Sequence, residues 1–209
     1  MPIKIFDICG TLYNSNTTLD FCEWIEKRPF NKMILKVFKS YPVKILNKLL
    51  MKIFHFDFIR ALHIKSLKGM TLNEIESQVN FFVQRVLNQK KILEVHTLFQ
   101  QIERTDVILV SATIEPIAKA VAHELNVKQY YATTLWYDKD KYCTGKIDRD
   151  ILGQKHLLFK NEEIDLIVTD NKSDYKLCLK AKQVVIVSKK KNLAFWKSKN
   201  LNIHRVIEI

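Results

Sequence analysis

The sequence has few of the residues and patterns that mark export, cysteine-based metal binding or membrane insertion. Its four cysteines, Cys9, Cys22, Cys143 and Cys178, form no C-x-x-C pair, so neither a zinc knuckle nor a redox motif is indicated. No stretch reaches the roughly 18 uncharged apolar residues of a membrane-spanning helix. No apolar signal segment follows Met1. We therefore expect a reduced, cytoplasmic setting.

Linker sequences and acidic residues are also scarce. The 209 residues include only four glycines and four prolines, and no repeat or Ser/Gly/Pro-rich linker is present. Lysine and arginine total 34 against 22 acidic residues, which gives a formal net charge of +12. Such a surface attracts metabolite phosphates, nucleic acid or anionic lipid. Lysines spread over solvated faces explain the charge equally well, so it names no partner.

Short apolar runs alternate with helical patterns along most of the chain. Runs typical of strands cover residues 3–6, 107–110, 129–134, 164–169 and 184–187, and a short element is expected near 205–208. Turn residues between 137 and 147 predict a hairpin or flap. Strands that alternate with helices predict an α/β fold with a doubly wound, mostly parallel sheet.

A long helical block interrupts this alternation after the first strand. Residues 32–39 and 43–54 repeat apolar residues at helical spacing, and Thr71 and Glu74 have the spacing of a capping box. We predict a helical cap domain over residues 16–100, inserted into a core domain made of residues 1–15 and 101–209.

Polar residues directly follow three of the predicted strands. They are Asp7, Ser111 and Asp170. Ligands of open sheets bind beyond the carboxyl ends of the strands, so these residues should meet at one edge. Two carboxylates there are costly without a cation, and Mg²⁺ suits a site with few protein carboxylates. The alternative is that the aspartates only cap strand ends and Ser111 caps a helix.

Further groups are expected at the same edge. Lys155 precedes the fourth strand and would bring an ammonium group close. A hydroxyl, an ammonium and a metal together make a cradle for a phosphoryl group, whose transfer needs mainly positioning and charge neutralisation. The backbone N–H groups of Ile8, Cys9 and Gly10 are expected to add an anion-binding nest.

Four segments resemble, in order and spacing, the motifs of the haloacid dehalogenase superfamily. They are FDICGTLY at 6–13, VSAT at 110–113, Lys155 in GQK, and TDNKSD at 169–174. The segment SATIEPIAKAVAHELNV and the later TGKID are similar to the phosphoserine-phosphatase-like branch. The resemblance implies a Rossmann-like parallel sheet with a helical cap, and a phosphatase that acts on a small phosphorylated metabolite.

The resemblance also implies roles for individual residues. Asp7 would be the nucleophile that forms an aspartyl phosphate. Mg²⁺ would be held by Asp7, the backbone carbonyl of Cys9 and Asp170, with Asp174 acting through a water or orienting Lys155. Thr11 would order the turn. The phosphate would be bound by Asp7, Ile8, Cys9, Gly10, Ser111, Ala112 and Lys155.

Residue 9 departs from the family pattern, which has a second aspartate there as general acid and base. The thiol of Cys9 has an ordinary pKa near ~8.5, so it is mostly protonated at neutral pH and is a poor base. We favour an active phosphatase in which substrate or water supplies the proton. The alternatives are a phosphotransferase or other phosphoryl chemistry, and a non-catalytic phosphate-binding homologue. Retention of Asp7, Ser111, Lys155, Asp170 and Asp174 argues against the last.

The predicted cap is strongly basic. Its apolar residues, such as Leu35, Phe38, Leu46, Leu50 and Phe54, are interpreted as bundle core. The alternative is an amphipathic surface that contacts a membrane, which would suit a lipid or polyprenyl phosphate substrate. No nucleic-acid partner is expected, because no recognised motif is present. Sequences with this cysteine-containing motif resemble phosphatases of bacterial surface-polysaccharide biosynthesis, which implies a sugar or amino-alcohol phosphate.

Overall fold

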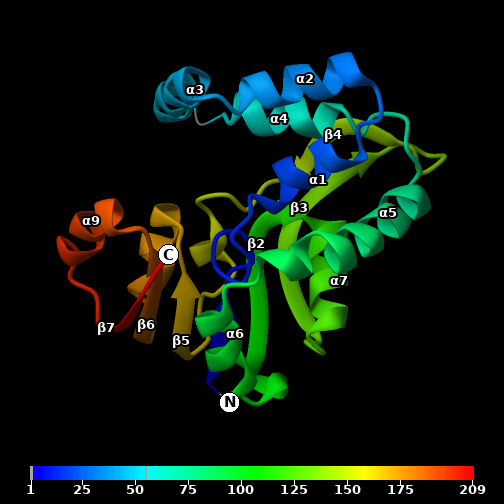
Figure 1. Ribbon diagram of the computed structural model, residues 1–209. Coiled ribbons are helices and arrows are strands. Elements are labelled where there is room, and N and C mark those ends of the chain that lie inside the picture. Colours follow the sequence, from blue (N-terminus) through cyan, green and yellow to red (C-terminus); the bar gives the residue numbers. More distant parts are fainter. Residues whose placement is uncertain (1, 55) are drawn as a thin grey trace.

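A seven-stranded sheet forms the body of the protein in the computed structural model, which describes residues 2–54 and 56–209. The strand order is β4-β3-β2-β1-β5-β6-β7 (Figure 1). All neighbouring strands are parallel except β4, which is antiparallel to β3. The predicted doubly wound α/β fold is thereby confirmed. The strands are β1 (Ile3–Phe6), β2 (Val107–Ile114), β3 (Gln129–Tyr137), β4 (Cys143–Arg149), β5 (Ile164–Thr169), β6 (Ala181–Ser188) and β7 (Ile203–Glu208).

The register of the central strands places their carboxyl ends together. Phe6, the last residue of β1, pairs with Leu109 of β2 and with Val168 of β5. The next amide, that of Asp7, donates to the carbonyl of Val168 over 3.0 Å. The residues that follow β1 and β5 therefore emerge side by side at one edge of the sheet.

Helices cover both faces of the sheet because successive side chains of a strand point to opposite faces. Phe6 contributes to a core with α6 (Leu93–Gln100) and α7 (Glu115–Glu124), and its ring lies 5.1 Å from that of Phe99. Ile5 contributes to a second core with α8 (Tyr175–Cys178) and α9 (Leu193–Lys197), which includes Trp196. Residues 93–100, which the prediction counted with the cap, thus lie against the sheet.

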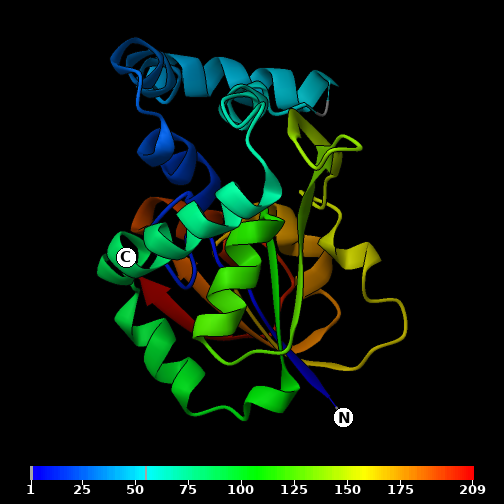
Figure 2. The same ribbon diagram turned by 90° about the vertical axis from the view of Figure 1, so that its right-hand side faces the viewer.

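The helices between residues 17 and 85 build the cap, which stands beyond the carboxyl ends of the strands (Figures 1 and 2). Thr71 caps the last of them: its hydroxyl accepts from the Glu74 amide over 3.2 Å, and Glu74 accepts from the Thr71 amide over 2.8 Å. The predicted capping box is therefore present. The helices are α1 (Thr17–Ile25), α2 (Pro29–Phe38), α3 (Tyr41–Phe54), α4 (Phe58–Lys65) and α5 (Leu72–Arg85).

Backbone hydrogen bonds join the cap to the core at the two connecting segments and at the hairpin. Where the chain leaves and re-enters the core, Asn14 donates to Lys90 over 2.8 Å and Ile92 donates to Leu12 over 3.0 Å. The predicted hairpin, β3–β4, reaches the cap through backbone hydrogen bonds of 2.8 Å from Gly69 to Cys143 and from Cys143 to Met70. The cap is thus braced on the hairpin as well as on its two connections.

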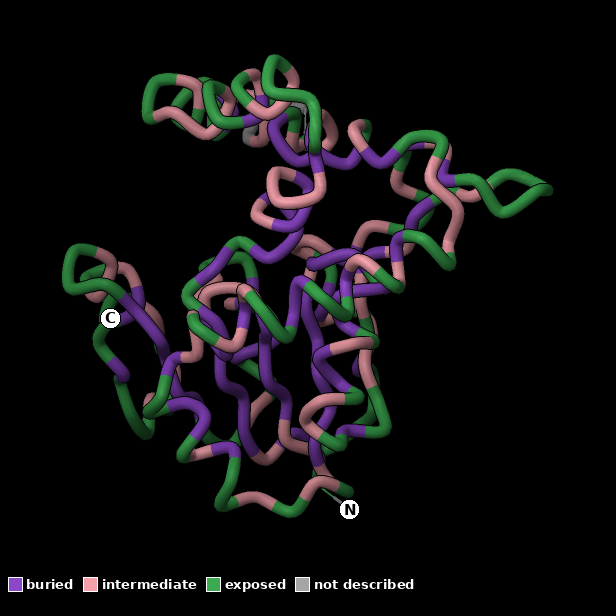
Figure 3. Tube along the Cα trace, turned by 45° about the vertical axis from the view of Figure 1, so that its right-hand side comes forward, coloured by how far each residue is buried: buried purple, intermediate pink, exposed green. Residues whose placement is uncertain are grey.

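The outer cap has less core than the sequence predicted. Leu35 is buried and Phe38 and Leu50 are partly buried, but Leu46 is 56 % exposed, so its interpretation as bundle core is wrong. The side chain of Phe54 lies outside the described part of the chain. Exposed segments run along the outermost helices (Figure 3). Within residues 2–54 and 56–209, none of the helices combines the length and apolarity that a bilayer crossing requires.

Candidate active site

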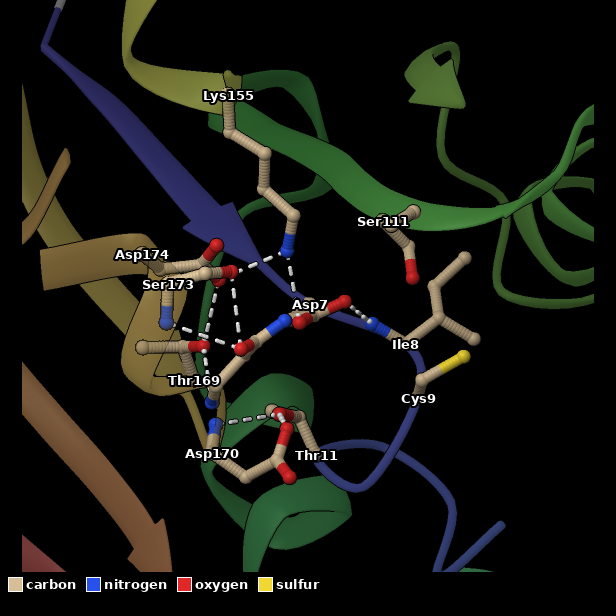
Figure 4. A network of polar contacts seen from close by, with 12 residues as sticks. Asp7, Ile8, Cys9, Thr11, Ser111, Lys155, Thr169, Asp170, Ser173 and Asp174 are labelled. Carbon is tan, nitrogen blue, oxygen red and sulfur yellow. Dashed lines mark hydrogen bonds and ion pairs between the residues drawn. The ribbon is translucent and has the colours of Figure 1, made fainter. Parts of the chain in front are cut away.

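Asp7 lies at the centre of a polar network at the carboxyl edge of the sheet (Figure 4). The residue is 3 % exposed, and β1, which it follows, is flanked by strands on both sides. Its Oδ1 accepts from the Ile8 amide over 2.7 Å, and its Oδ2 accepts from Lys155 Nζ over 2.8 Å. Both contacts hold the carboxylate in one orientation.

Lys155 joins the first strand to the segment after β5. It begins a short 3-10 helix, η3 (Lys155–Leu157), and its ammonium also donates to Asp174 Oδ2 over 2.7 Å. Burial alone lowers the pKa of this ammonium, but the carboxylates of Asp7 and Asp174 more than offset that, so its pKa lies above the ordinary value. The lysine is therefore a permanent positive charge between two carboxylates.

Asp174 is fixed by a second donor. The hydroxyl of Thr169, the last residue of β5, donates to Asp174 Oδ2 over 2.8 Å. Asp174 lies in the 3-10 helix η4 (Lys172–Asp174), which Asn171 caps by accepting from the Ser173 amide. Its Oδ1 is buried and has no hydrogen-bond partner among the described residues.

Asp170 packs against the turn after Asp7. The Thr11 hydroxyl accepts from the Asp170 amide over 2.9 Å and donates to its Oδ1 over 3.2 Å. Gly10 has a φ of +67°, and a Cβ there would lie 2.3 Å from Asp170 Oδ2. Only glycine fits this close approach. Burial and the charge of Asp7 raise the pKa of Asp170.

The charges at this edge fit a divalent cation. Asp7, Asp170 and Asp174 bring three carboxylates against one ammonium, so the cluster is short of positive charge. Among the described residues no three acidic, histidine or cysteine side chains form a metal cage by themselves. Mg²⁺ suits such a set, because it binds one or two carboxylates and keeps several waters. Asp7, Asp170 and the Cys9 carbonyl are the groups that would hold it.

Ser111 and Ala112 approach the site from β2, which continues to Ile114 instead of ending before Ser111. The Ser111 side chain is fully buried and points toward Asp7 (Figure 4). The carbonyl of Ala112 accepts from Arg60 Nη2 over 2.6 Å. A residue of cap helix α4 therefore contacts the segment that carries Ser111.

The turn after β1 offers fewer free amides than the sequence suggested. The Ile8 amide donates to Asp7, and the Gly10 amide donates to the carbonyl of Tyr13 over 2.8 Å. The expected three-amide nest is therefore wrong for Gly10, whose N–H closes the turn. The Cys9 amide makes no hydrogen bond within the part of the chain that the structure describes.

The thiol of Cys9 begins a row of hydroxyl groups that leads toward the cap. Its Sγ lies 2.8 Å from Thr17 Oγ1, and Thr17 donates to Thr113 Oγ1 over 2.7 Å. Thr18 Oγ1 lies 3.2 Å from the same Thr113 oxygen. Burial and the charge of Asp7 raise the pKa of Cys9, so the thiol stays protonated at neutral pH.

Sequence reasoning missed several of these contacts. Arg60 belonged to the basic residues of the predicted cap, and no contact with the core was expected of it. The residue is 6 % exposed and contacts Asp150 and Ala112. Thr169 was treated as the end of a strand, and Thr113 as part of a motif without a contact of its own. The signal for Thr113 and Thr169 was their position within the quoted motifs VSAT and TDNKSD, whereas Arg60 lies in neither motif.

The fold and this edge of the sheet together define an α/β protein with a helical cap, two aspartates beyond strand ends and a buried lysine between carboxylates. The chain belongs to the haloacid dehalogenase-like hydrolases, because the model of that family matches residues 5–178. The predicted superfamily is thus confirmed. A comparison with curated protein sequences gives no significant match.

Solved structures share the fold at low sequence identity. A protein of unknown function from Bordetella pertussis Tohama I has a TM-score of 0.70 and 13% identity, with 99% of this chain and 98% of that chain covered. A substrate-bound phosphoserine phosphatase has a TM-score of 0.58 and 15% identity, with 100% and 93% covered. A cytosolic 5'-nucleotidase IIIB bound to cytidine has a TM-score of 0.66 and 12% identity, with 97% and 80% covered.

Proposed function

We propose that this hydrolase is a Mg²⁺-dependent phosphomonoesterase that forms an aspartyl phosphate on Asp7. The observation that carries the proposal is the position of Asp7: a buried carboxylate held by Lys155 at the carboxyl edge of the sheet, with Asp170 in the same polar network (Figure 4). A carboxylate fixed in this way and paired with a permanent cation is available as a nucleophile at neutral pH.

The chain's own residues divide the work of phosphoryl transfer. A carboxylate oxygen of Asp7 attacks phosphorus while the bond from phosphorus to the leaving oxygen breaks. Lys155 and the Ser111 hydroxyl lie where they would bind the phosphoryl oxygens. Mg²⁺, when bound, supplies further positive charge to the same oxygens. Asp174 and Thr169 keep Lys155 in place.

Protons are supplied by water in this proposal. The raised pKa of Cys9 opposes loss of its proton, so the thiol is a weak acid and no base. A water molecule gives its proton to the leaving oxygen, and the remaining hydroxide attacks phosphorus. The bond to Asp7 then breaks, which releases inorganic phosphate and restores the carboxylate. The sum of both steps is the hydrolysis of a phosphomonoester.

A small phosphorylated metabolite is the proposed substrate class. The cap stands over the carboxyl edge of the sheet and would restrict access to the site (Figures 1 and 2). Phosphoserine phosphatases and a 5'-nucleotidase share the fold. Amino-alcohol phosphates, sugar phosphates of polysaccharide biosynthesis and nucleoside monophosphates are therefore the first compounds to test. Five charged or hydroxyl side chains lie together at this edge, which supports an enzyme over a non-catalytic homologue. They are Asp7, Ser111, Lys155, Asp170 and Asp174.

Phosphate release from such a panel tests the proposal. Release should require Mg²⁺, stop with a chelator, and fall by at least about 10⁴-fold in Asp7→Asn. Asp165→Asn is the matched control, because Asp165 lies within β5 and should change neither rate nor metal requirement. Acid quenching during turnover should trap phosphate on the wild-type chain and not on Asp7→Asn. Activity that survives in Asp7→Asn would refute the mechanism.

A further inference from the structure

The two outermost cap helices expose a stripe of apolar side chains. On α2 it consists of Met33 and Val37, each 55 % exposed. On α3 it continues through Tyr41 at 78 %, Ile45 at 45 %, Leu49 at 54 % and Ile53 at 67 %. These six residues, called here the apolar cap face, follow one another at intervals of four. Soluble proteins rarely leave so large an apolar patch uncovered without a partner for it.

The orientation of both helices is fixed by their opposite faces. On α3, buried Asn47 donates to Asp57 Oδ1 over 2.9 Å and accepts from the Ile59 amide over 3.3 Å. Asn47 is two residues from both Ile45 and Leu49, which places it on the far side of the helix. On α2, buried Leu35 has the same relation to Met33 and Val37. The apolar cap face is therefore turned outward by contacts that the cap already makes.

The charged residues of α2 and α3 are all positive. Residues 27–56 contain no aspartate or glutamate. Lys36, Lys44 and Lys48 are exposed and form no ion pair within the described residues, whereas Lys39 is already bound by Asp20 and Glu23. Lys44 and Lys48 each directly precede a residue of the apolar cap face, so their ammonium groups lie along its edge.

We propose that the apolar cap face docks on an anionic lipid bilayer. Apolar side chains in line along a helix, bordered by lysines, match the boundary between acyl chains and negatively charged headgroups. The lysine stems would extend toward the headgroups while the apolar side chains enter the bilayer. Each lysine near such a surface adds electrostatic attraction. Helices α2 and α3 thus supply both the apolar side chains and the lysines for this contact.

Two other partners fit the charges less well. A symmetric pair of chains would bring Lys36, Lys44 and Lys48 of each copy against the same residues of the other, with no acidic residue from 27–56 to compensate. Nucleic acid would satisfy the lysines but would leave the apolar side chains against a polar backbone. An anionic bilayer pairs the lysines with negative headgroups and also takes up the apolar side chains.

Vesicle sedimentation with the full chain tests the proposal. The wild type should sediment with vesicles of phosphatidylcholine and phosphatidylglycerol, and at least about tenfold less with phosphatidylcholine alone. The triple variant Ile45→Ser/Leu49→Ser/Ile53→Ser and the double variant Lys44→Glu/Lys48→Glu should each lower binding at least about tenfold. All five positions lie on α3 and are exposed, so the cap core is left intact. Asp7→Asn should bind vesicles like the wild type, which separates docking from catalysis.

Matched controls carry the same changes elsewhere. Leu93→Ser on α6, at 75 % exposure, and Lys128→Glu/Lys160→Glu should bind as the wild type does. Absence of wild-type binding to the anionic vesicles would overturn the proposal. So would binding that the α3 variants leave unchanged. A dimer in sedimentation velocity that the triple serine variant dissociates, without vesicle binding, would instead assign the face to a second copy of the chain.

Discussion

Arg60 of the cap and Asp150 of the core form a two-pronged ion pair, with Nη1 at 2.8 and 2.9 Å from the two carboxylate oxygens. The Nη2 atom of Arg60 donates to the Ala112 carbonyl and to the hydroxyl of Thr133. One cap side chain therefore holds the segment after Ser111 and the end of the β3–β4 hairpin at the same time. We expect the position of the cap over the site to depend on this residue.

Asp150→Asn should destabilise the protein in a pH-dependent way. Burial raises the pKa of Asp150, but Arg60 and neighbouring hydrogen bonds more than offset this, so the pKa lies below its ordinary value. A carboxyl group with a depressed pKa stabilises the fold above its unfolded pKa of about 3.9, and this contribution is lost as pH falls further. The difference in thermal midpoint between wild type and variant should be widest near neutral pH and narrow below about pH 4.

The control for this measurement is Asp148→Asn, since Asp148 is exposed and, among the described residues, accepts only from the Thr134 hydroxyl. It should shift the thermal midpoint little. We expect Arg60→Met, which removes the guanidinium itself, to cost about 1–3 kcal/mol. A pH-independent difference for Asp150→Asn would show that its charge is not involved.

Lys155→Met should cost stability as well as activity. Removal of the buried ammonium leaves Asp7 and Asp174 without their shared counter-charge, which typically costs about 3–5 kcal/mol. Adding Asp174→Asn removes one of the stranded charges and should restore part of that loss in denaturant unfolding. Phosphate release should stay abolished in the double variant, because Lys155 is still missing. Unchanged stability of Lys155→Met would contradict the network as described.

Gly10→Ala should abolish activity out of proportion to its effect on folding. The added methyl group would collide with the Asp170 carboxylate, and the φ of +67° is strained for alanine. We expect a rate loss of at least about 10²-fold and a higher Mg²⁺ requirement, measured by metal titration of phosphate release. Gly69→Ala is the matched control: its φ of +86° is equally strained, but open space surrounds the new methyl group. It should lower stability by about 1 kcal/mol and leave the rate unchanged.

Cys9→Asp should keep or raise turnover of generic phosphate esters. A carboxyl group at this position would donate and accept the proton that the thiol holds, a form of help worth about 10²–10⁴-fold in favourable cases. The backbone carbonyl of residue 9 is the group expected to face the metal, so the affinity for Mg²⁺ should not change. Cys9→Ala should retain the wild-type rate, because water supplies the protons. Loss of Mg²⁺ binding in Cys9→Asp would show that the side chain matters to the metal.

Much of the sheet could be predicted from the sequence because its central strands are buried on both faces. A continuous apolar run such as 107–110 needs no partner information to be recognised, and the polar residues that follow the strands at 3–6, 107–110 and 164–169 mark the functional edge. Asp7 and Asp170 follow from that rule alone. Lys155 was placed at the same edge, where its ammonium meets Asp7.

Sequence patterns did not predict the contacts between the cap and the core. Helical periodicity identifies apolar faces, but α2 and α3 have apolar residues on two sides, so it could not separate buried Leu35 from exposed Leu46. Arg60 looked like any other basic cap residue, because its partners are 52 and 90 residues away. The Gly10 amide seemed free because its acceptor, Tyr13, depends on how the turn closes.

Tyr13 lies where the chain leaves the core for the cap, and Lys91 lies where it returns. The two residues form an antiparallel bridge, so the chain departs for the cap and comes back at a single point. The two connecting segments are thus paired below the cap, next to the paired strands β1 and β2 that carry Asp7 and Ser111. The inserted helices can therefore differ from one protein to another with β1 and β2 still paired, provided that contacts such as those of Thr17 and Arg60 with the core are kept.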